Sequence, residues 1–178
     1  AAKGTGAAGN PEGVALAKKV NAAYAKVPGV EMAFAGEVAG LPAGAEGVTA
    51  QVKLDAGKFT GMRVAVTVKG QKVATIVNSA GIFAQAPGKS CWIKAPATAA
   101  AFGELNTPIL PMTDGVTYSK PVKKGANLVL TATGSKSLSQ TGIADVTVNA
   151  KTMKVVSVKA DTATITFTDM DKAPAVAT

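Results

Sequence analysis

The chain has 178 residues, of which 47% are hydrophobic and 4% aromatic, with nineteen basic and eleven acidic residues for a net charge of +8. This length predicts a single domain with a sizeable core. Without histidine and with one cysteine, the chain lacks the most common general base and excludes an internal disulfide or a thiolate zinc cluster. The cysteine, Cys91, stands beside Trp92 in an apolar run, which favours a buried thiol.

The basic residues are almost all lysines, and Arg63 is the only arginine. Proteins that read nucleic acids favour arginine and aromatic side chains, so we predict no nucleic-acid partner. A cationic surface drawn to an anionic membrane fits better, although solubility alone also explains the charge. The small residues 1–9 predict a flexible tether, as at the start of an exported and trimmed protein. The sequence contains no run of 18 or more apolar residues, so it predicts no membrane span.

An amphipathic helix is predicted directly after the tether. Asn10 is a suitable cap, Pro11 suits the first helical position and Glu12 suits the positive end of the helix dipole. Apolar residues recur at helical spacing as far as Val27, and Pro28 ends the pattern. We expect the apolar stripe to lie on a sheet; a free helix on a membrane surface is the alternative.

Alternation of apolar and polar residues between glycine, proline and asparagine predicts about ten or eleven antiparallel strands. The predicted strands cover residues 30–40, 48–55, 62–68, 73–77, 82–84, 91–93, 116–119, 128–133, 143–149, 155–159 and 162–168. Between them, a short helix is predicted from Thr98. The apolar segment 104–114 contains Pro108 and Pro111, which predict a covering loop or a mobile lid rather than a central strand.

These elements predict an α+β fold with a strongly curved antiparallel sheet and helices on one side, because open sheets of this size tend to curl. The apolar side chains are mostly alanine and valine, and a wide sheet lined with small side chains can leave a hollow. A compositional bias of the genome is an equally good explanation of the alanine content.

The order of parts resembles the LolA/LolB-like superfamily, and most closely the LppX/LprG-type lipoproteins of actinobacteria. The similarity rests on a helix running into the strand at Val30, on the pair Lys58-Phe59 before a strand, and on Trp92 in a strand that follows the Gly81 strand. It also rests on the turn at 149–156 and the ending at 166–176. Superfamily members carry an arginine directly after that phenylalanine, where this chain has Thr60.

The resemblance implies a half-barrel whose concave apolar face is covered by the N-terminal helix and a helix-loop insertion. Residues 10–178 would form a single LolA/LppX-like lipid-binding domain. It implies a monomeric, non-enzymatic carrier of a lipid, glycolipid or lipoprotein acyl chains. The carrier would need no cofactor. Its place would be the bacterial cell envelope, held at the membrane by an N-terminal anchor and a basic surface.

The expected wall of the apolar cavity combines strand residues with residues of the proline-bearing segment. It consists of Met32, Phe34, Val52, Leu54, Val64, Val66, Ile76, Phe83, Trp92, Leu105, Ile109, Leu110 and Met112. Which face of each strand points inward stays open at this point, and ordinary core packing explains each residue equally well.

Two other classes of function are consistent with the same residues. An envelope sensor or protein–protein interaction module would use this fold with a filled interior. An enzyme could use scattered carboxylates such as Asp55, Asp114 and Asp145, but the chain has neither histidine nor a G-x-S-x-G nucleophile elbow. The sequence therefore favours a non-enzymatic role.

Overall fold

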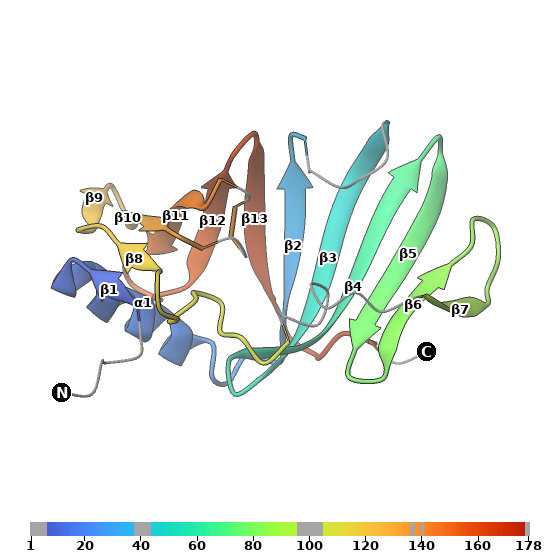
Figure 1. The fold of residues 1–178 in the computed structure, drawn as a ribbon, viewed down its shortest axis with the longest axis horizontal. Helices are drawn as coiled ribbons and strands as arrows, with labels where there is room; N and C mark the ends of the chain where they lie inside the picture. The colour runs from blue at the N-terminus through green and yellow to red at the C-terminus, as the bar shows by residue number, and fades with distance from the viewer. Residues whose placement is uncertain (1–6, 38–43, 96–104, 136–137, 140, 177–178) are drawn as a thin grey trace.

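The computed structural model describes residues 7–37, 44–95, 105–135, 138–139 and 141–176. In these residues the protein is mostly β, with the helix α1 (Pro11–Ala23) near the N-terminus and one large sheet of 13 strands (Figure 1). The predicted helix from Thr98 lies outside the described residues.

The strands follow the predicted series closely. They are β1 (Ala8–Gly9), β2 (Gly29–Ala35), β3 (Ala45–Asp55), β4 (Lys58–Val68), β5 (Gln71–Asn78), β6 (Gly81–Gln85), β7 (Trp92–Ala95), β8 (Thr117–Tyr118), β9 (Val122–Lys124), β10 (Asn127–Thr133), β11 (Ile143–Asn149), β12 (Val155–Ala160) and β13 (Ala163–Met170). Two short strands were not predicted: β1, which falls at the end of the expected tether, and β9.

The order across the sheet is β1-β8-β10-β11-β12-β13-β2-β3-β4-β5-β6-β7, with β9 paired to β10. All pairs are antiparallel except β1 with β8. The last strand, β13, pairs with the first long strand, β2, placing Phe167 opposite Met32. The meanders from the two halves of the chain therefore join in the middle of one continuous sheet.

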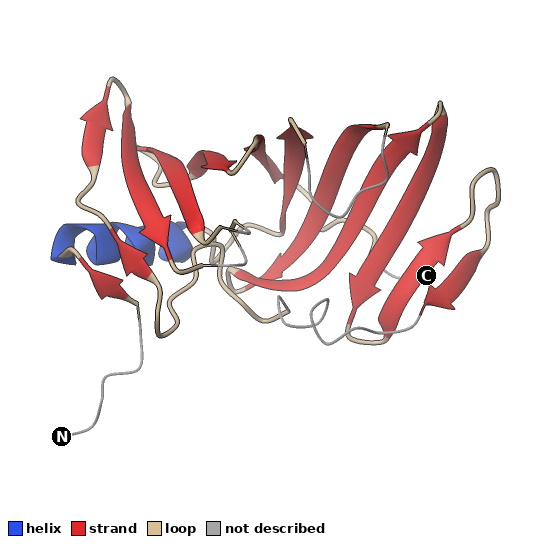
Figure 2. Cartoon of the chain, turned by 45° about the horizontal axis from the view of Figure 1, so that its top comes forward, coloured by secondary structure: helices blue, strands red, loops and turns tan. Residues whose placement is uncertain are grey.

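The prediction of a strongly curved half-barrel is wrong, because the sheet is open and not strongly curled. Its ends, β1 and β7, lie at opposite ends of the molecule (Figure 1). The helix lies against one end of the sheet only (Figure 2). Among the described residues, the core cluster that the helix joins occupies part of one face of the sheet.

The strand register sorts the side chains into two faces, since directly opposed residues on neighbouring strands lie on the same side of the sheet. One face is mostly apolar across its width and is named the apolar face. A row across it consists of Phe167, Met32, Ala50, Val64, Thr75, Ala84 and Ile93. The corresponding row on the other side, the polar face, consists of Thr168, Glu31, Gln51, Arg63, Ile76, Phe83 and Lys94.

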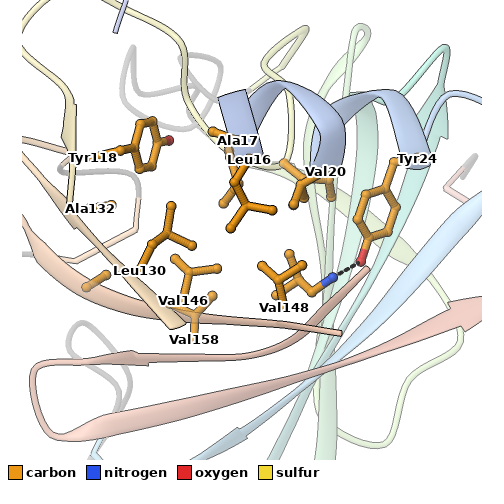
Figure 3. Close-up of a cluster of buried hydrophobic side chains, with 14 of the residues drawn as sticks. Leu16, Ala17, Val20, Tyr24, Tyr118, Leu130, Ala132, Val146, Val148 and Val158 are labelled. Atoms are coloured by element: carbon orange, nitrogen blue, oxygen red, sulfur yellow. Dashed lines mark hydrogen bonds between the residues drawn. The ribbon is translucent and has the colours of Figure 1, made fainter. Parts of the chain in front are cut away.

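Helix α1 packs on the apolar face, as predicted. The Asn10 side chain accepts a hydrogen bond from the Glu12 backbone N–H at 3.0 Å, and Pro11 begins the helix. Leu16, Val20 and Tyr24 are buried, and they point toward side chains of β10, β11 and β12 (Figure 3). The sheet side chains shown there are Leu130, Ala132, Val146, Val148 and Val158, with Tyr118 from β8.

Two glycines allow the helix to approach the sheet closely at each end. A Cβ atom on Gly13 would overlap the Ser119 carbonyl next to β8. At the other end, a Cβ atom on Gly57, in the turn between β3 and β4, would lie 3.1 Å from the Asn21 carbonyl oxygen. Gly57 also has a φ of +78°, which side-chain-bearing residues rarely adopt. The helix thus bridges β8 and the β3–β4 turn.

Candidate functional site

The segment 105–116, named the cover segment, lies beside the start of β4 and over the apolar face. The Asn106 N–H donates to the Phe59 carbonyl at 2.6 Å, and the Phe59 N–H donates to the Thr107 carbonyl at 2.9 Å. Pro108 forms an isolated antiparallel bridge with Lys58. These bonds tie the segment to β4 without making it a strand, which is consistent with the prolines that predicted a covering loop.

Asn21 of the helix holds the middle of the cover segment. Its side-chain Nδ2 donates to the Leu110 carbonyl at 2.8 Å, and the Leu110 N–H donates to Asn21 Oδ1 at 2.9 Å. Leu110 is fully buried, so its backbone groups cannot turn to water. The amide side chain of Asn21 therefore replaces the strand partner that the proline-bearing segment lacks.

Two buried tyrosines fix the ends of this arrangement. The Tyr118 hydroxyl donates to the Pro111 carbonyl at 2.7 Å. The Tyr24 hydroxyl oxygen accepts from the Val155 N–H at 3.0 Å, a bond drawn in Figure 3. Lys154 lies 4.3 Å from the centre of the Tyr24 ring and 3.0 Å from Asp169. Burial raises the pKa of both phenols well above the ordinary value, because a phenolate would lose its hydration.

The helix, the cover segment and the strands beneath them form one core cluster. Beyond it, the apolar face continues over β2 and β4–β7 with side chains that do not pack against this cluster. We name these residues the open apolar surface. They are Phe34, Val64, Val66, Val68, Val73, Ile82, Ala84 and Ile93. All are partly buried except Ile93, which is 59% exposed.

The predicted cavity residues divide into four groups. Those in the core cluster or packed against it are Met32, Val52, Leu54, Ile109, Leu110 and Met112. Phe34, Val64 and Val66 belong to the open apolar surface. Leu105, at the start of the cover segment, is half buried and does not pack on the core cluster. The strand residues among these ten lie on one face of the sheet, as a shared binding surface requires.

The remaining predicted residues, Ile76, Phe83 and Trp92, lie on the polar face. Ile76 opposes Arg63 on β4 and Phe83 on β6, while Trp92 opposes Gln85. The Arg63 guanidinium lies 5.9 Å from the centre of the Trp92 ring. The thirteen residues therefore do not line a single surface, because these three side chains lie on the other side of the sheet.

The C-terminal segment crosses the polar face at the opposite side from the helix. The Asn78 side chain donates to the Val176 carbonyl at 2.7 Å. A Cβ on Gly61 would meet the Val176 side chain at 2.8 Å, and one on Gly29 would meet Pro174 at 2.7 Å. This contact explains why Asn78 and its neighbours on this face are covered, and it keeps this end of the polar face from serving as a ligand surface.

The residues that sequence reasoning missed are Val68, Val73, Ile82, Ala84 and Ile93. Each was recognised within a strand, but not as part of the candidate site. The signal that would have found them is the pairing register, since Val66 opposes Val73 and Ala84 opposes Ile93. A register cannot be read from one strand at a time.

The carboxylates of Asp145 and Asp161 form hydrogen bonds with nearby threonine hydroxyls. Asp145 accepts from the Thr131 hydroxyl at 2.7 Å, and Asp161 accepts from the Thr141 hydroxyl at 2.6 Å. Across the described ranges, no three His, Cys, Asp or Glu residues gather in a way that could hold a metal ion.

The prediction of a buried Cys91 is wrong: the thiol is exposed, because the residue precedes β7 at the edge of the sheet.

In the part of the chain that is described, no helix has the length and hydropathy needed to cross a membrane.

No protein-family model matches the sequence, and no curated protein matches it. Among solved structures, the chain is similar to a LolA superfamily protein, NE2245 from Nitrosomonas europaea. The identity is 13% and the TM-score 0.37, over 92% of this chain and 94% of that one.

Proposed function

We propose that this chain is a non-enzymatic carrier that binds the acyl chains of a lipid, glycolipid or lipoprotein in the bacterial cell envelope. Residues 10–178 act as a single binding domain of the LolA/LppX kind. The observation that supports the proposal is the open apolar surface: within the described residues, its apolar side chains continue the apolar face beyond the core cluster without packing against that cluster. The LppX/LprG-type identity and the envelope location belong to the same proposal.

The chemistry of this surface suits an alkyl chain. Its residues are aliphatic apart from Phe34, so they offer dispersion contacts, and Thr75 stands among them with one hydroxyl group. Each buried methylene contributes about 0.8 kcal/mol, so ten of them contribute about 8 kcal/mol. That is enough to offset the lower range of the entropic cost of association, which is about 4–15 kcal/mol. Burial of an acyl chain can therefore supply useful affinity by itself.

The cover segment provides the boundary of the proposed site. Met112 and Met32 are partly buried and pack against the core cluster, and Met32 stands in the same row of the apolar face as Val64. Methionine adapts to irregular shapes, so these side chains suit a boundary that an acyl chain of variable length must contact. Ile109 and Leu110 stay in the core, where they hold the segment in place.

Native mass spectrometry of the protein purified from a bacterial host, before and after organic extraction, tests the proposal. We expect a stoichiometric mass increment that disappears on extraction, with the released lipid identified by its own mass. An apo mass together with no uptake of a fluorescent diacyl lipid would overturn the proposal. That result would favour an interaction module with a filled interior.

A matched pair of variants in β4 makes the test specific. Val66→Glu places a charge on the open apolar surface, while Thr67→Glu places the same charge on the polar face opposite Lys72. Both positions are half buried, so both variants are expected to fold. We expect lipid uptake to fall at least tenfold for Val66→Glu and less than twofold for Thr67→Glu. Equal losses would show that the apolar face is not the binding surface.

A further inference from the structure

One corner of the molecule carries several exposed lysines next to an exposed apolar side chain; in β9 (Val122–Lys124), Lys124 lies on the same side as Val122 and Lys123 on the other. Lys120, Lys123 and Lys124 lie in and next to β9, and Val122 between them is 56% exposed. Lys151 joins them from the β11–β12 turn. We name Lys120, Val122, Lys123, Lys124 and Lys151 the basic corner.

Backbone hydrogen bonds make the basic corner a fixed arrangement. Strand β9 pairs with β10, with Val122 opposite Val129 and Lys124 opposite Asn127. The Ala150 N–H donates to the Ala126 carbonyl at 3.0 Å, which places the turn carrying Lys151 beside the β9–β10 turn. The Asn149 side chain accepts from the Lys151 N–H at 3.0 Å and so shapes that turn.

Little negative charge compensates these lysines. Lys120 lies 3.5 Å from Glu12, but both side chains are more than 60% exposed, and such pairs are weak. Within the described ranges, Lys123, Lys124 and Lys151 form no ion pair. The corner therefore presents a positive field to whatever approaches β9.

We propose that the basic corner is a docking surface for an anionic lipid membrane. Lysine is a point charge that attracts phosphate headgroups without reading their geometry, and Val122 offers an apolar contact at the membrane interface. A nucleic acid is a poorer partner, because the corner has no arginine and no aromatic side chain on which a base could stack. Strand β1 pairs with β8, which ends at Tyr118, two residues before Lys120. Strand β1 therefore lies at this same end of the sheet.

The docking orientation follows from the placement of the strands. The basic corner lies at the β9 end of the sheet, and β5, β6 and β7 lie at the opposite end (Figure 1). A molecule docked through β9 directs the open apolar surface away from the membrane, toward a partner in the aqueous space. This orientation, unlike the docking itself, rests on the proposed function.

Flotation with lipid vesicles tests the docking. The probe is a vesicle of phosphatidylcholine with 30% phosphatidylglycerol, and the control is a vesicle of phosphatidylcholine alone. We expect binding to the first only. Each lysine near an anionic surface contributes a factor of about five in binding. The double substitution Lys123→Gln with Lys124→Gln is therefore expected to weaken binding about twentyfold.

A matched control separates the corner from overall charge. Lys69→Gln with Lys72→Gln removes the same charge from exposed positions near the β4–β5 turn at the other end of the sheet. We expect less than a threefold effect from this control. Equal weakening by both double variants, or no binding of the unmodified protein to anionic vesicles, would overturn the proposal.

Two further variants remove the remaining ambiguities. Val122→Ser is expected to weaken vesicle binding several-fold at 0.3 M salt, where screening reduces the electrostatic part (about 5–6 Å Debye length). Tighter binding to random single-stranded DNA than to vesicles, unaffected by Val122→Ser, would instead assign the corner to a polyanion. Val66→Glu should bind vesicles normally, so a failure of the lipid-carrier proposal is distinguishable from a failure of docking.

Discussion

Asn21 and Leu110 are joined by a pair of hydrogen bonds, 2.8 and 2.9 Å long, between one amide side chain and one peptide group. They are 89 residues apart in the sequence. This pair is the most direct link between the helix and the cover segment, and both groups of Leu110 that it satisfies are buried.

Replacing Asn21 with alanine is expected to lower the free energy of unfolding by about 2–4 kcal/mol, because two buried backbone groups lose their partners. Urea unfolding measures this change. Hydrogen exchange at the Leu110 amide should accelerate more than exchange in β11. Asn10→Ala is the control, since it removes only the helix cap and should cost about 1 kcal/mol. Equal losses for the two variants would show that Asn21 acts only through the helix.

The protein's two tyrosines, Tyr24 and Tyr118, should ionise at a higher pH in the folded state than in the unfolded state. Burial raises the pKa of both phenols, so ionisation is disfavoured in the folded state. Their contribution to stability is complete below pH about 10, the unfolded pKa, and decreases as the pH rises above it.

The phenolate absorbance near 295 nm is the measurement. In concentrated urea it should rise around pH 10. In the native protein it should stay flat at that pH and appear only together with the loss of the circular dichroism of the sheet. A full rise near pH 10 with the fold intact would contradict the burial of the two hydroxyls.

Much of the fold could be predicted from the sequence, because the strands alternate and the turns carry glycine, proline or asparagine. Strands β1 and β9 were missed because β1 (Ala-Gly) lies in the run of small residues that predicted a tether, and β9 (Val-Lys-Lys) shows no alternation of apolar and polar residues. The curvature was overestimated because strand number alone does not show how much of a face is covered. The cover segment is held to the helix by Asn21. Helical periodicity places Asn21 in the helix but does not indicate that it binds Leu110.

The candidate site could be predicted only in part, for a reason visible in β5. Val73 and Val77 lie on one face and Ile76 on the other, so alternation cannot decide which face points inward. Pairing shows only which residues share a face: Val73 opposes Val66, and Ile76 opposes Arg63. Trp92 was predicted in the cavity wall, but it lies on the polar face with its ring beside Arg63.

Removing the two tyrosine hydroxyls should have unequal effects on stability. Tyr24→Phe leaves the buried Val155 N–H without an acceptor, and we expect a loss of about 1–3 kcal/mol. Tyr118→Phe deprives the Pro111 carbonyl of a donor, and buried carbonyls tolerate this better than N–H groups. Thermal or urea unfolding of the two variants should therefore rank Tyr24→Phe as less stable. The reverse order would contradict the assignment of donor and acceptor at Tyr24.

Trp92 provides a test of which face receives the acyl chain. Because Trp92 lies on the polar face, a bound palmitoyl chain carrying bromine atoms should quench its fluorescence by less than about one tenth. A tryptophan at position 66, introduced by Val66→Trp together with Trp92→Phe, should be quenched strongly, since bromine quenches at contact distance. Iodide in solution should quench Trp92, which is half exposed, and so serve as the control for its accessibility. Strong quenching of Trp92 by the brominated lipid would place the chain on the polar face and contradict the proposed site.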